Sequence, residues 1–540
     1  MAEIQQLVER SYSSEPKYTE VKAGLPEDYS EIKTIRDLLE INYKLVEARD
    51  QLRRNLVAMM KSGEKKYPQI IGYDDTVIPA LDRAILSRHD IFLIGQIGQA
   101  KTKLVEIIAK NLLSPMPIIE GSITNDCPMD LPAQDLVSLL EGQEHTTSPK
   151  FHISPESSQK ILDNTLDTKI VWVDGHRRFR YVLATPDISV KDLVGYIDAI
   201  KVAKKGVEMF KIDSYSPGQL LQAKHGIFCI DELPVLDPRK QVALLSVLQE
   251  GRYTTGSYPV IFEPKTAFFA TANPIDYTHS GKIIEPLYDR LKSHIHTHYP
   301  KTVNDEMLII LQEAKIANCL VPVFVLKTLA RLVHNARSNP EINQAKGVSV
   351  RLGIHGLELL VGESERVRSV SHQGVAVPRH SDMYCLSQIA KFELSEIDDT
   401  IENRHKTFHD LLDGAIKETC LEYLKGIEPA KLESIKQEFS GKTFQVSQKM
   451  VWENGQASYK NQLQEFSNLA SLIDSKMEQA AQDQQAFGKR LDEEKIQSQS
   501  MQNEKAPGEL KAAFLEIILD GLCYLAPKII DKKEAGYVAA

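Results

Sequence analysis

The sequence lacks closely spaced cysteines and long hydrophobic runs. Its six cysteines are scattered through 540 residues without a Cys-x-x-Cys pair. This pattern argues against a zinc ribbon or a disulfide framework and is typical of a reducing, cytoplasmic compartment. Because no run of about 18 apolar residues occurs, we expect no membrane-spanning helix. The N-terminus has no basic start followed by an apolar core, so we also expect no signal peptide.

Positive charge is also scarce. The 65 Lys and Arg residues face 74 Asp and Glu residues, which gives a formal net charge of −9. An acidic chain offers no global reason to expect a nucleic-acid partner, although a locally basic pore could exist within it. The chain is too long for one compact core, and we expect two to four domains.

The first informative segment is Gly95-Gln-Ile-Gly-Gln-Ala-Lys101-Thr102. It follows the short apolar run Ile91–Ile94, which predicts a buried parallel strand. Residues 103–113 then carry apolar side chains at helical spacing. A loop between a strand and a helix N-terminus directs backbone N–H groups and the positive end of the helix dipole at an anion.

This segment therefore predicts a phosphate-binding loop. Its glycines allow the backbone to approach phosphates, Lys101 would reach the β- and γ-phosphates of ATP, and the Thr102 hydroxyl would bind Mg²⁺. The strict motif has Gly where this chain has Ala100. The alternative is a strand–helix turn that binds nothing. The predicted nucleotide-binding residues are Gly95, Gly98, Gln99, Ala100, Lys101 and Thr102.

The second informative segment is Gly226-Ile-Phe-Cys-Ile-Asp231-Glu232. Residues 227–230 predict another short buried strand, and the acidic pair follows it at the carboxyl edge of the sheet, where ligands bind in α/β folds. Asp231 would hold the Mg²⁺ shell, and Glu232 would act as general base on the attacking water. The alternative is a solvated acidic turn.

A wider series of motifs resembles a known family. The segments 67–72, 95–102, 215–232, 271–274 and 287–291 occur in the order found in the AAA+ ATPases of the magnesium-chelatase ATPase subunit and MoxR group. The resemblance covers residues 67–396. It implies an α/β fold, with a P-loop parallel-sheet core and a helical lid. The sequence patterns outside it predict helical regions at both ends of the chain.

The resemblance also assigns three further residues. Asn273 matches sensor 1, Arg290 matches the arginine finger that acts on the neighbouring subunit's nucleotide, and Arg351 matches sensor 2. Asn273 has independent support, because residues 266–272 predict a strand that would end beside the acidic pair. Val350 departs from the small residue or Pro that the family has before sensor 2. The alternatives are a strand-end Asn, a surface ion pair and a solvated helix N-terminal Arg.

Four regions follow from these patterns. We expect an N-terminal helical region at 1–66, the nucleotide-binding α/β domain at 67–300, a helical lid at 301–400 and a C-terminal helical region at 401–540. No internal repeat of about 20 to 50 residues is evident.

Three hairpins are expected in the α/β region. Residues 192–210 followed by 215–218, and residues 252–262 with a turn at Gly256, resemble family hairpins that face a pore or a partner, and structural decoration is the alternative. Residues 169–183 predict a third hairpin around Asp174-Gly175, within the segment 126–185, whose function the sequence does not reveal.

Two periodic patterns have open interpretations. Apolar residues in 463–491 recur at spacings of three and four, with Gln484 as the polar exception. They predict either a helix packed within the monomer or a coiled-coil arm for a partner. His294, His296 and His298 share one face of a predicted strand. They suggest either a metal site or sheet packing.

We therefore expect a ring-forming, hexameric AAA+ ATPase that couples Mg²⁺-dependent ATP hydrolysis to remodelling or metal-cofactor maturation of a partner protein. The last 140 residues lack Asp-x-Ser-x-Ser, so a von Willebrand domain would belong to a separate partner. A sigma-54-type activator would need a Gly-Ala-Phe-Thr-Gly-Ala loop, which is absent. A helicase is disfavoured by the net acidity, and a nucleotide-gated scaffold without turnover by Glu232 and Arg290. The sequence does not identify the client, and the hexameric ring is what the family resemblance implies.

Overall fold

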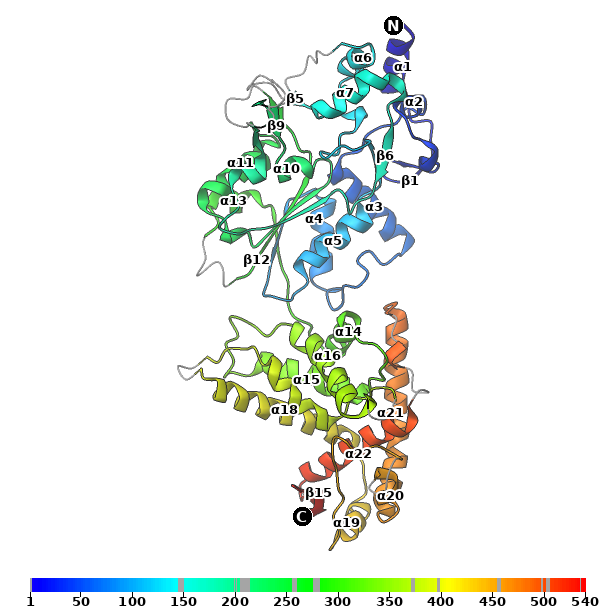
Figure 1. Cartoon of the computed structure of the whole chain (residues 1–540), viewed down its shortest axis with the longest axis vertical. Helices are drawn as coiled ribbons and strands as arrows, with labels where there is room; N and C mark the ends of the chain where they lie inside the picture. Colours follow the sequence, from blue (N-terminus) through cyan, green and yellow to red (C-terminus); the bar gives the residue numbers. More distant parts are fainter. Residues whose placement is uncertain are drawn as a thin grey trace. The chain divides into compact units, whose positions relative to one another are not determined.

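The structure, a computed structural model, consists of two compact units, Met1–His298 and Tyr299–Ala540. Both are drawn in Figure 1. The residues that the structure describes are 2–143, 150–198, 200, 202–203, 214–254, 260–274, 282–370, 374–395, 399–453, 458–496, 499–501, 506–534 and 536–540.

A five-stranded parallel sheet forms the centre of the first unit, in the order β13-β3-β12-β10-β7. Its strands are short and apolar, as expected for a sheet that is covered on both faces. The five strands are β3 (Ile91–Ile94), β7 (Phe179–Leu183), β10 (Ile227–Asp231), β12 (Ala267–Ala272) and β13 (Ser293–His296).

Helices cover both faces of this sheet (Figure 1). Successive residues of β3 divide between the faces, with Ile91 and Leu93 in one hydrophobic cluster and Phe92 and Ile94 in the other. The first cluster includes α3 (Ala48–Ser62), α4 (Val77–Leu86) and α5 (Lys101–Leu112). The second includes α8 (Val190–Val194), α10 (Gln219–Gln222), α11 (Pro238–Glu250) and α13 (Glu285–Arg290).

Residues 1–66 pack within this same unit. Helix α3 lies against α4 and α5, and the two helices before it bury apolar faces against the segment 116–173. That subassembly has its own core, which contains Leu38, Leu39 and Leu136. Its elements are α1 (Ala2–Ser13), β1 (Glu20–Lys22), β2 (Leu25–Pro26), η1 (Tyr29–Glu31), α2 (Ile35–Glu40), β4 (Met116–Ile119), η2 (Pro128–Asp130), α6 (Ala133–Leu140), α7 (Pro155–Asn164), η3 (Thr165–Asp167) and β6 (Ile170–Val173).

The hairpin predicted at 169–183 is wrong. Strand β6 pairs antiparallel with β4, whereas β7 joins the central sheet in parallel with β10. The two strands separate because their apolar residues belong to different cores: Val173 packs with Met116, and Val182 packs in the second cluster of the central sheet. Gly175 lies so close to α5 that a methyl group there would overlap the Ala109 carbonyl oxygen.

The bases of the other two predicted hairpins are present. Strand β8 (Tyr196–Ile197) pairs antiparallel with β9 (Tyr215–Ser216) between α8 and α10. At the second, Tyr253 and Phe262 exchange two backbone hydrogen bonds of 2.9 Å. Here β11 (Ile261–Phe262) also pairs in parallel with β5 (Lys150–Phe151). The expected turn at Gly256 lies outside the described residues.

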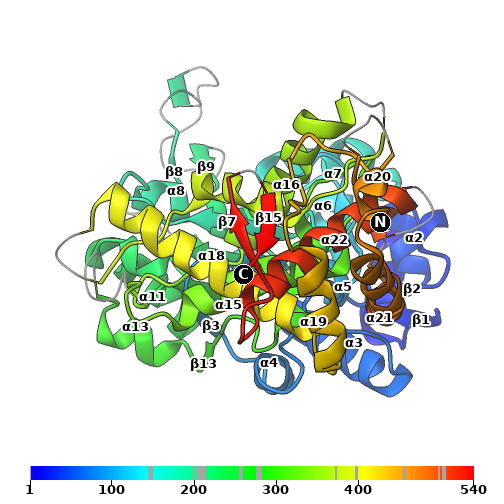
Figure 2. The same cartoon turned by 90° about the horizontal axis from the view of Figure 1, so that it is seen from below.

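The second unit is mainly helical. Helix α18 packs alongside α15 and also against α22 (Figure 2). This packing joins residues 401–540 to the region predicted as the lid. The elements of the unit are α14 (Val303–Glu313), α15 (Val323–Ser338), α16 (Arg351–Ser364), the π-helix η6 (Glu365–Ser369), η7 (His380–Ile389), α18 (Ile401–Tyr423), α19 (Pro429–Glu438), α20 (Tyr459–Leu463), α21 (Ser467–Glu493), η8 (Gln499–Met501), α22 (Pro507–Tyr524), β14 (Ile530–Lys533) and β15 (Gly536–Ala539).

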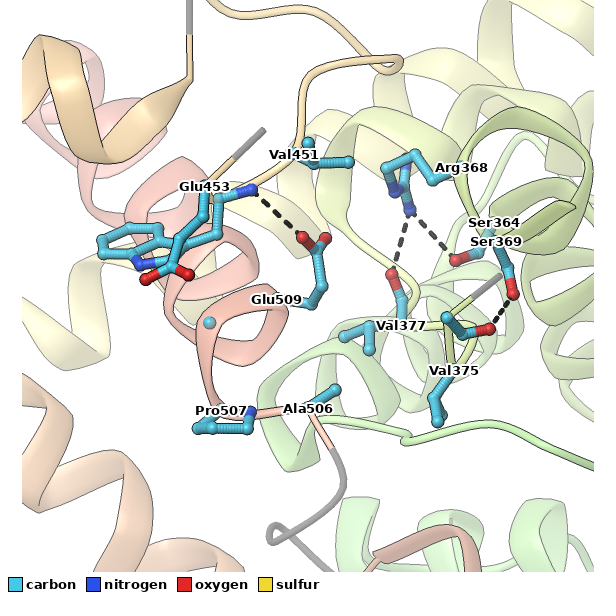
Figure 3. Close-up of a pocket in the computed structure, with 13 residues that line it drawn as sticks. Ser364, Arg368, Ser369, Val375, Val377, Val451, Glu453, Ala506, Pro507 and Glu509 are labelled. Atoms are coloured by element: carbon cyan, nitrogen blue, oxygen red, sulfur yellow. Dashed lines mark hydrogen bonds between the residues drawn. The ribbon is translucent and has the colours of Figure 1, made fainter. Parts of the chain in front are cut away.

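A buried arginine links distant segments of this unit. Arg368 donates hydrogen bonds of 2.9 and 2.6 Å to the two carboxylate oxygens of Asp382, and others to Ser364 and to the carbonyl oxygens of Val377 and Gln448. Figure 3 shows part of this arrangement at the edge of a pocket of about 420 Å³. Both terminal nitrogens of the buried guanidinium are engaged in these internal contacts.

The periodic segment 463–491 packs within the monomer. Helix α21 buries apolar residues against α15, α19 and α22, which confirms the intramolecular alternative. Its polar exception, Gln484, accepts a 2.8 Å hydrogen bond from the Val323 N–H and donates to the Met501 carbonyl oxygen. The side chain is buried at little cost in free energy because both the oxygen and the nitrogen of its amide form hydrogen bonds. Among the described residues, no helix is long and apolar enough to cross a membrane.

A charged cluster lies where the acidic strand β10 begins. Lys224 and Lys265 place their ammonium groups 2.8 and 2.7 Å from the Asp130 carboxylate, and His225 Nε2 lies 3.4 Å from it. His152 also faces Asp130. Burial opposes ionisation of Asp130, but Lys224 and His225 outweigh it and hold its pKa below the usual value. Burial lowers the pKa of His225 to about 4, although Asp130 opposes that shift.

The lowered pKa of His225 predicts acid sensitivity. The unfolded chain, in which His has a pKa of about 6.5, binds a proton that the folded protein excludes, so stability falls as pH decreases from about 6.5 towards 4. We expect the wild type to lose about 2 kcal/mol from this group between pH 7 and 5. His225→Asn removes the titration and tolerates the positive φ of 58° at this position. Urea unfolding at both pH values measures the difference, and equal pH dependence of the two proteins would contradict it.

Gly226, which begins the acidic motif, leads to a second prediction about stability. A methyl group on Gly226 would overlap the carbonyl oxygen of Arg178, which also accepts a 3.0 Å hydrogen bond from the Ile227 N–H. We expect Gly226→Ala to lower the free energy of unfolding by about 1–3 kcal/mol, since the backbone at Arg178, just before β7, would have to move.

Gly414→Ala is the matched control. Gly414 lies inside α18 with no atom within 4 Å of an added methyl group, so the same change should stabilise by roughly 0.5–1 kcal/mol through helix propensity. Urea unfolding followed by circular dichroism compares the two variants. The packing argument fails if Gly226→Ala is as stable as the wild type.

Candidate nucleotide-binding site

The predicted phosphate loop connects β3 to the N-terminus of α5. Two of its residues have left-handed backbone conformations, Gly98 at φ 81° and Ala100 at φ 54°. Such a conformation suits glycine and is uncommon for alanine, which explains why the strict motif has Gly at the second position. Helix α5 begins directly after it, at Lys101, so the free amide groups of its first turn adjoin the loop.

The start of the loop is held in shape by Gly95 and Gln99. The Gly95 N–H donates a 3.0 Å hydrogen bond to the Ala272 carbonyl oxygen, and a methyl group on Gly95 would overlap Thr297 and Gln99. The Gln99 side chain accepts a 2.7 Å hydrogen bond from Thr297, and the backbone carbonyl oxygen of Gln99 accepts one of 2.8 Å from Tyr73. The side chain of Gln99 thus fixes the loop, a role that the sequence did not reveal.

Lys101 lies over the loop that it follows. Its side chain is largely buried, and Nζ donates hydrogen bonds of 2.6 and 3.1 Å to the carbonyl oxygens of Gly95 and Gln96. The ammonium group is therefore held against the backbone of the loop that would bind the phosphates.

The structure brings Thr102 and Asp231 together, as the two sequence motifs predicted. The Thr102 hydroxyl donates a 3.1 Å hydrogen bond to Asp231 Oδ2 across 129 residues of sequence. A hydroxyl and a carboxylate supply the oxygen ligands that Mg²⁺ prefers, with substrate phosphates completing its shell. The two residues fit a Mg²⁺ ion, which they would hold and which would supply positive charge against the charge that develops on the phosphates.

Two further hydroxyl groups reach Asp231. Thr271 donates to Asp231 Oδ1 and also accepts a 3.1 Å hydrogen bond from the Glu232 N–H. Tyr181 donates a 2.6 Å hydrogen bond to Asp231 Oδ2. Burial and the contact with Asp231 raise the pKa of Tyr181. Sequence reasoning missed both residues. Thr271 could have been found from its place beside Asn273, but the position of Tyr181 depends on strand pairing.

Glu232 and Asn273 lie next to each other at the same edge. Glu232 has a left-handed backbone with φ 56°, and its Oε2 accepts a 3.2 Å hydrogen bond from the backbone N–H of Asn273. Asn273 is 5% exposed and directly follows β12. Strained conformations of non-glycine residues are concentrated at functional sites, and this one directs Glu232 away from the line of β10.

The two predicted arginines lie in different units. Arg290 ends α13; its side chain is 42% exposed and lies 2.9 Å from Asp289 of the same helix. This contact matches the surface-pair alternative and also leaves the guanidinium accessible to a second subunit. Arg351 begins α16 in the second unit, where it is exposed. Its assignment as sensor 2 stays a prediction.

The metal alternative for the three histidines is wrong. Within the described part of the chain, no group of three His, Cys, Asp or Glu side chains could hold a metal ion. His294 instead packs edge-on against Phe92 and Tyr288, and His298 lies 2.7 Å from the Thr76 hydroxyl. These contacts account for His294 and His298, whereas His296 is exposed.

The sheet order brings the predicted site residues together. Strand β12, which ends one residue before Asn273, lies between the strand that precedes the predicted phosphate loop and the strand that carries the acidic pair. The loop, both acids and Asn273 consequently meet at one edge of the sheet.

Comparisons with known proteins give distant similarities. No family model matches the chain. The uncharacterized protein YeaC of Bacillus subtilis (strain 168) is 24% identical over 216 residues, which cover 37% of this chain and 64% of that protein. The chain therefore spans somewhat less than two thirds of the length of this relative.

Two solved structures are also similar. NtrX from Brucella abortus in complex with ATP is 13% identical with a TM-score of 0.33, covering 70% of this chain and 71% of that one. A complex between subunits BchI and BchD of magnesium chelatase is 17% identical with a TM-score of 0.31, covering 63% and 98%.

The buried position of Lys101 predicts a specific loss of nucleotide binding. Lys101→Ala removes a charge-assisted contact to phosphate and should weaken ATP binding by about 10- to 100-fold. Lys103→Ala, two residues further along α5, is the matched control and should bind within about twofold of the wild type. Isothermal titration calorimetry measures both affinities. Equal losses in the two variants would mean that only the general charge of the helix matters.

Proposed function

We propose that this protein is a Mg²⁺-dependent ATPase of the AAA+ class, related to the magnesium-chelatase ATPase subunit and MoxR group. The single observation that carries the proposal is the contact between Thr102 and Asp231, with Glu232 beside it. A hydroxyl from the phosphate loop and a carboxylate from a distant strand would meet in this way to share one metal ion.

Each residue at the edge would have one task. The loop amides and Lys101 bind the phosphates, and Thr102 and Asp231 hold the Mg²⁺ shell. Glu232 takes up the proton of the attacking water as general base. Asn273, adjacent to Glu232, orients that water towards the terminal phosphate.

Arg290 supports a site that is shared between subunits. Its exposed guanidinium could reach the nucleotide of a neighbouring copy, where an arginine finger stabilises the charge of the transition state. The resemblance of the motifs suggests a hexameric ring, a cytoplasmic location, and a partner with a von Willebrand domain that is remodelled or matured with a metal cofactor. A structure that pairs BchI with BchD is in keeping with two different subunits.

A nucleotide-gated scaffold is the principal alternative. Such a protein needs the phosphate loop but no general base and no arginine finger. The strained backbone of Glu232 favours turnover, since a scaffold has no use for a carboxylate held in that conformation.

A subunit-mixing experiment tests the shared site. Glu232→Gln and Arg290→Ala should each bind ATP and each lose turnover. A site that takes Glu232 from one subunit and Arg290 from the next becomes complete only when the two variants are neighbours. Random mixing at equal amounts should therefore restore about a quarter of wild-type turnover. Phosphate release against protein concentration gives the measurement.

Arg239→Ala is the control for loss of an exposed arginine, and it should keep near-wild-type turnover on its own. If the mixture stays inactive although both variants bind ATP and assemble, Arg290 does not act between subunits. If the wild type binds ATP but never hydrolyses it, the scaffold replaces the ATPase.

A further inference from the structure

Tyr181 is an exposed aromatic residue at the candidate Mg²⁺ site. It lies on β7, the edge strand of the central sheet, directly opposite Cys229 of β10. Its hydroxyl extends along the edge to Asp231 Oδ2 at 2.6 Å. The side chain remains 43% exposed. Packing alone therefore does not explain a tyrosine here, since phenylalanine would cover the same neighbouring surface.

The hydrogen bonds to Asp231 leave its carboxylate little freedom to rotate. Thr271 donates to Oδ1, while Thr102 and Tyr181 donate to Oδ2. An ionised carboxylate can accept about four hydrogen bonds, so these three contacts leave room for one more donor. The Mg²⁺ shell could use that remaining position without displacing Tyr181.

The three donors differ in what else they do. Thr102 would turn its oxygen to the metal, and Thr271 also accepts from the Glu232 N–H. Among the described residues, Tyr181 has one such hydrogen bond, which it donates to Asp231.

We propose that Tyr181 is a positioning residue that fixes the Asp231 carboxylate for the Mg²⁺ shell and thereby sets the Mg²⁺ affinity of the nucleotide complex. This inference rests on the proposed function, because it concerns the same site. Tyr181 would contact neither the phosphates nor the attacking water, and it would act only through Asp231.

Removal of the hydroxyl group tests this role. Tyr181→Phe should raise the Mg²⁺ concentration needed for half-maximal tightening of ATP binding by about tenfold, the size expected for one hydrogen bond to a charged group. ATP binding in EDTA should not change, because the loop and Lys101 are intact. Calorimetric titration of ATP at a series of Mg²⁺ concentrations measures both quantities.

Tyr196→Phe is the matched control. Tyr196 is similarly exposed, at 42%, on β8, which pairs with β9 outside the central sheet, and its variant should keep the wild-type Mg²⁺ dependence. The inference is overturned if Tyr181→Phe weakens binding equally in EDTA, or if the two variants shift the Mg²⁺ dependence alike. Because binding is the readout, a wild type that binds Mg²⁺ and ATP without hydrolysis would disprove the ATPase proposal and leave this test intact.

Discussion

The candidate site depends on the parallel register of three neighbouring strands. Ile94 of β3 pairs with Ala272 of β12, and Ala270 of β12 pairs with Ile230 of β10. Since parallel strands end at the same edge, this register places the loop after β3 and the acidic pair at the end of β10 on either side of Asn273. A shift of one residue would turn the apolar side chains of a strand to the wrong face, so the packing that stabilises the sheet also fixes the spacing of the site.

The sequence predicted those parts of the fold that are encoded locally. Three central strands, the helix after the loop and the residues at the strand ends all follow from short patterns, and the structure has them. The hairpin at 169–183 was wrong because periodicity identifies a strand but not its partner. Helix α3 shows the same limit: the surface that it covers is formed by α4 and α5, which the sequence pattern of α3 does not describe.

The same limit applies to the site. Lys101, Asp231 and Glu232 stand in motifs whose chemistry can be read directly, whereas Tyr181 stands in a segment without a motif. It reaches Asp231 only because β7 joins the sheet beside β10. Gln99 is the converse case, since it lies in a phosphate-binding motif but directs its side chain to Thr297. Residue type and spacing identify the ligands of a site better than the residues that hold them.

The contacts at the edge also bear on how activity could be controlled. Asp231, Glu232 and the loop are already held by internal hydrogen bonds, so ATP would meet preformed groups and cause little reorganisation. Arg290, by contrast, is exposed and paired only with its neighbour in sequence among the contacts described. If it completes the site of an adjacent subunit, assembly supplies the missing positive charge. Turnover would then depend on contact between subunits more than on any rearrangement within one of them.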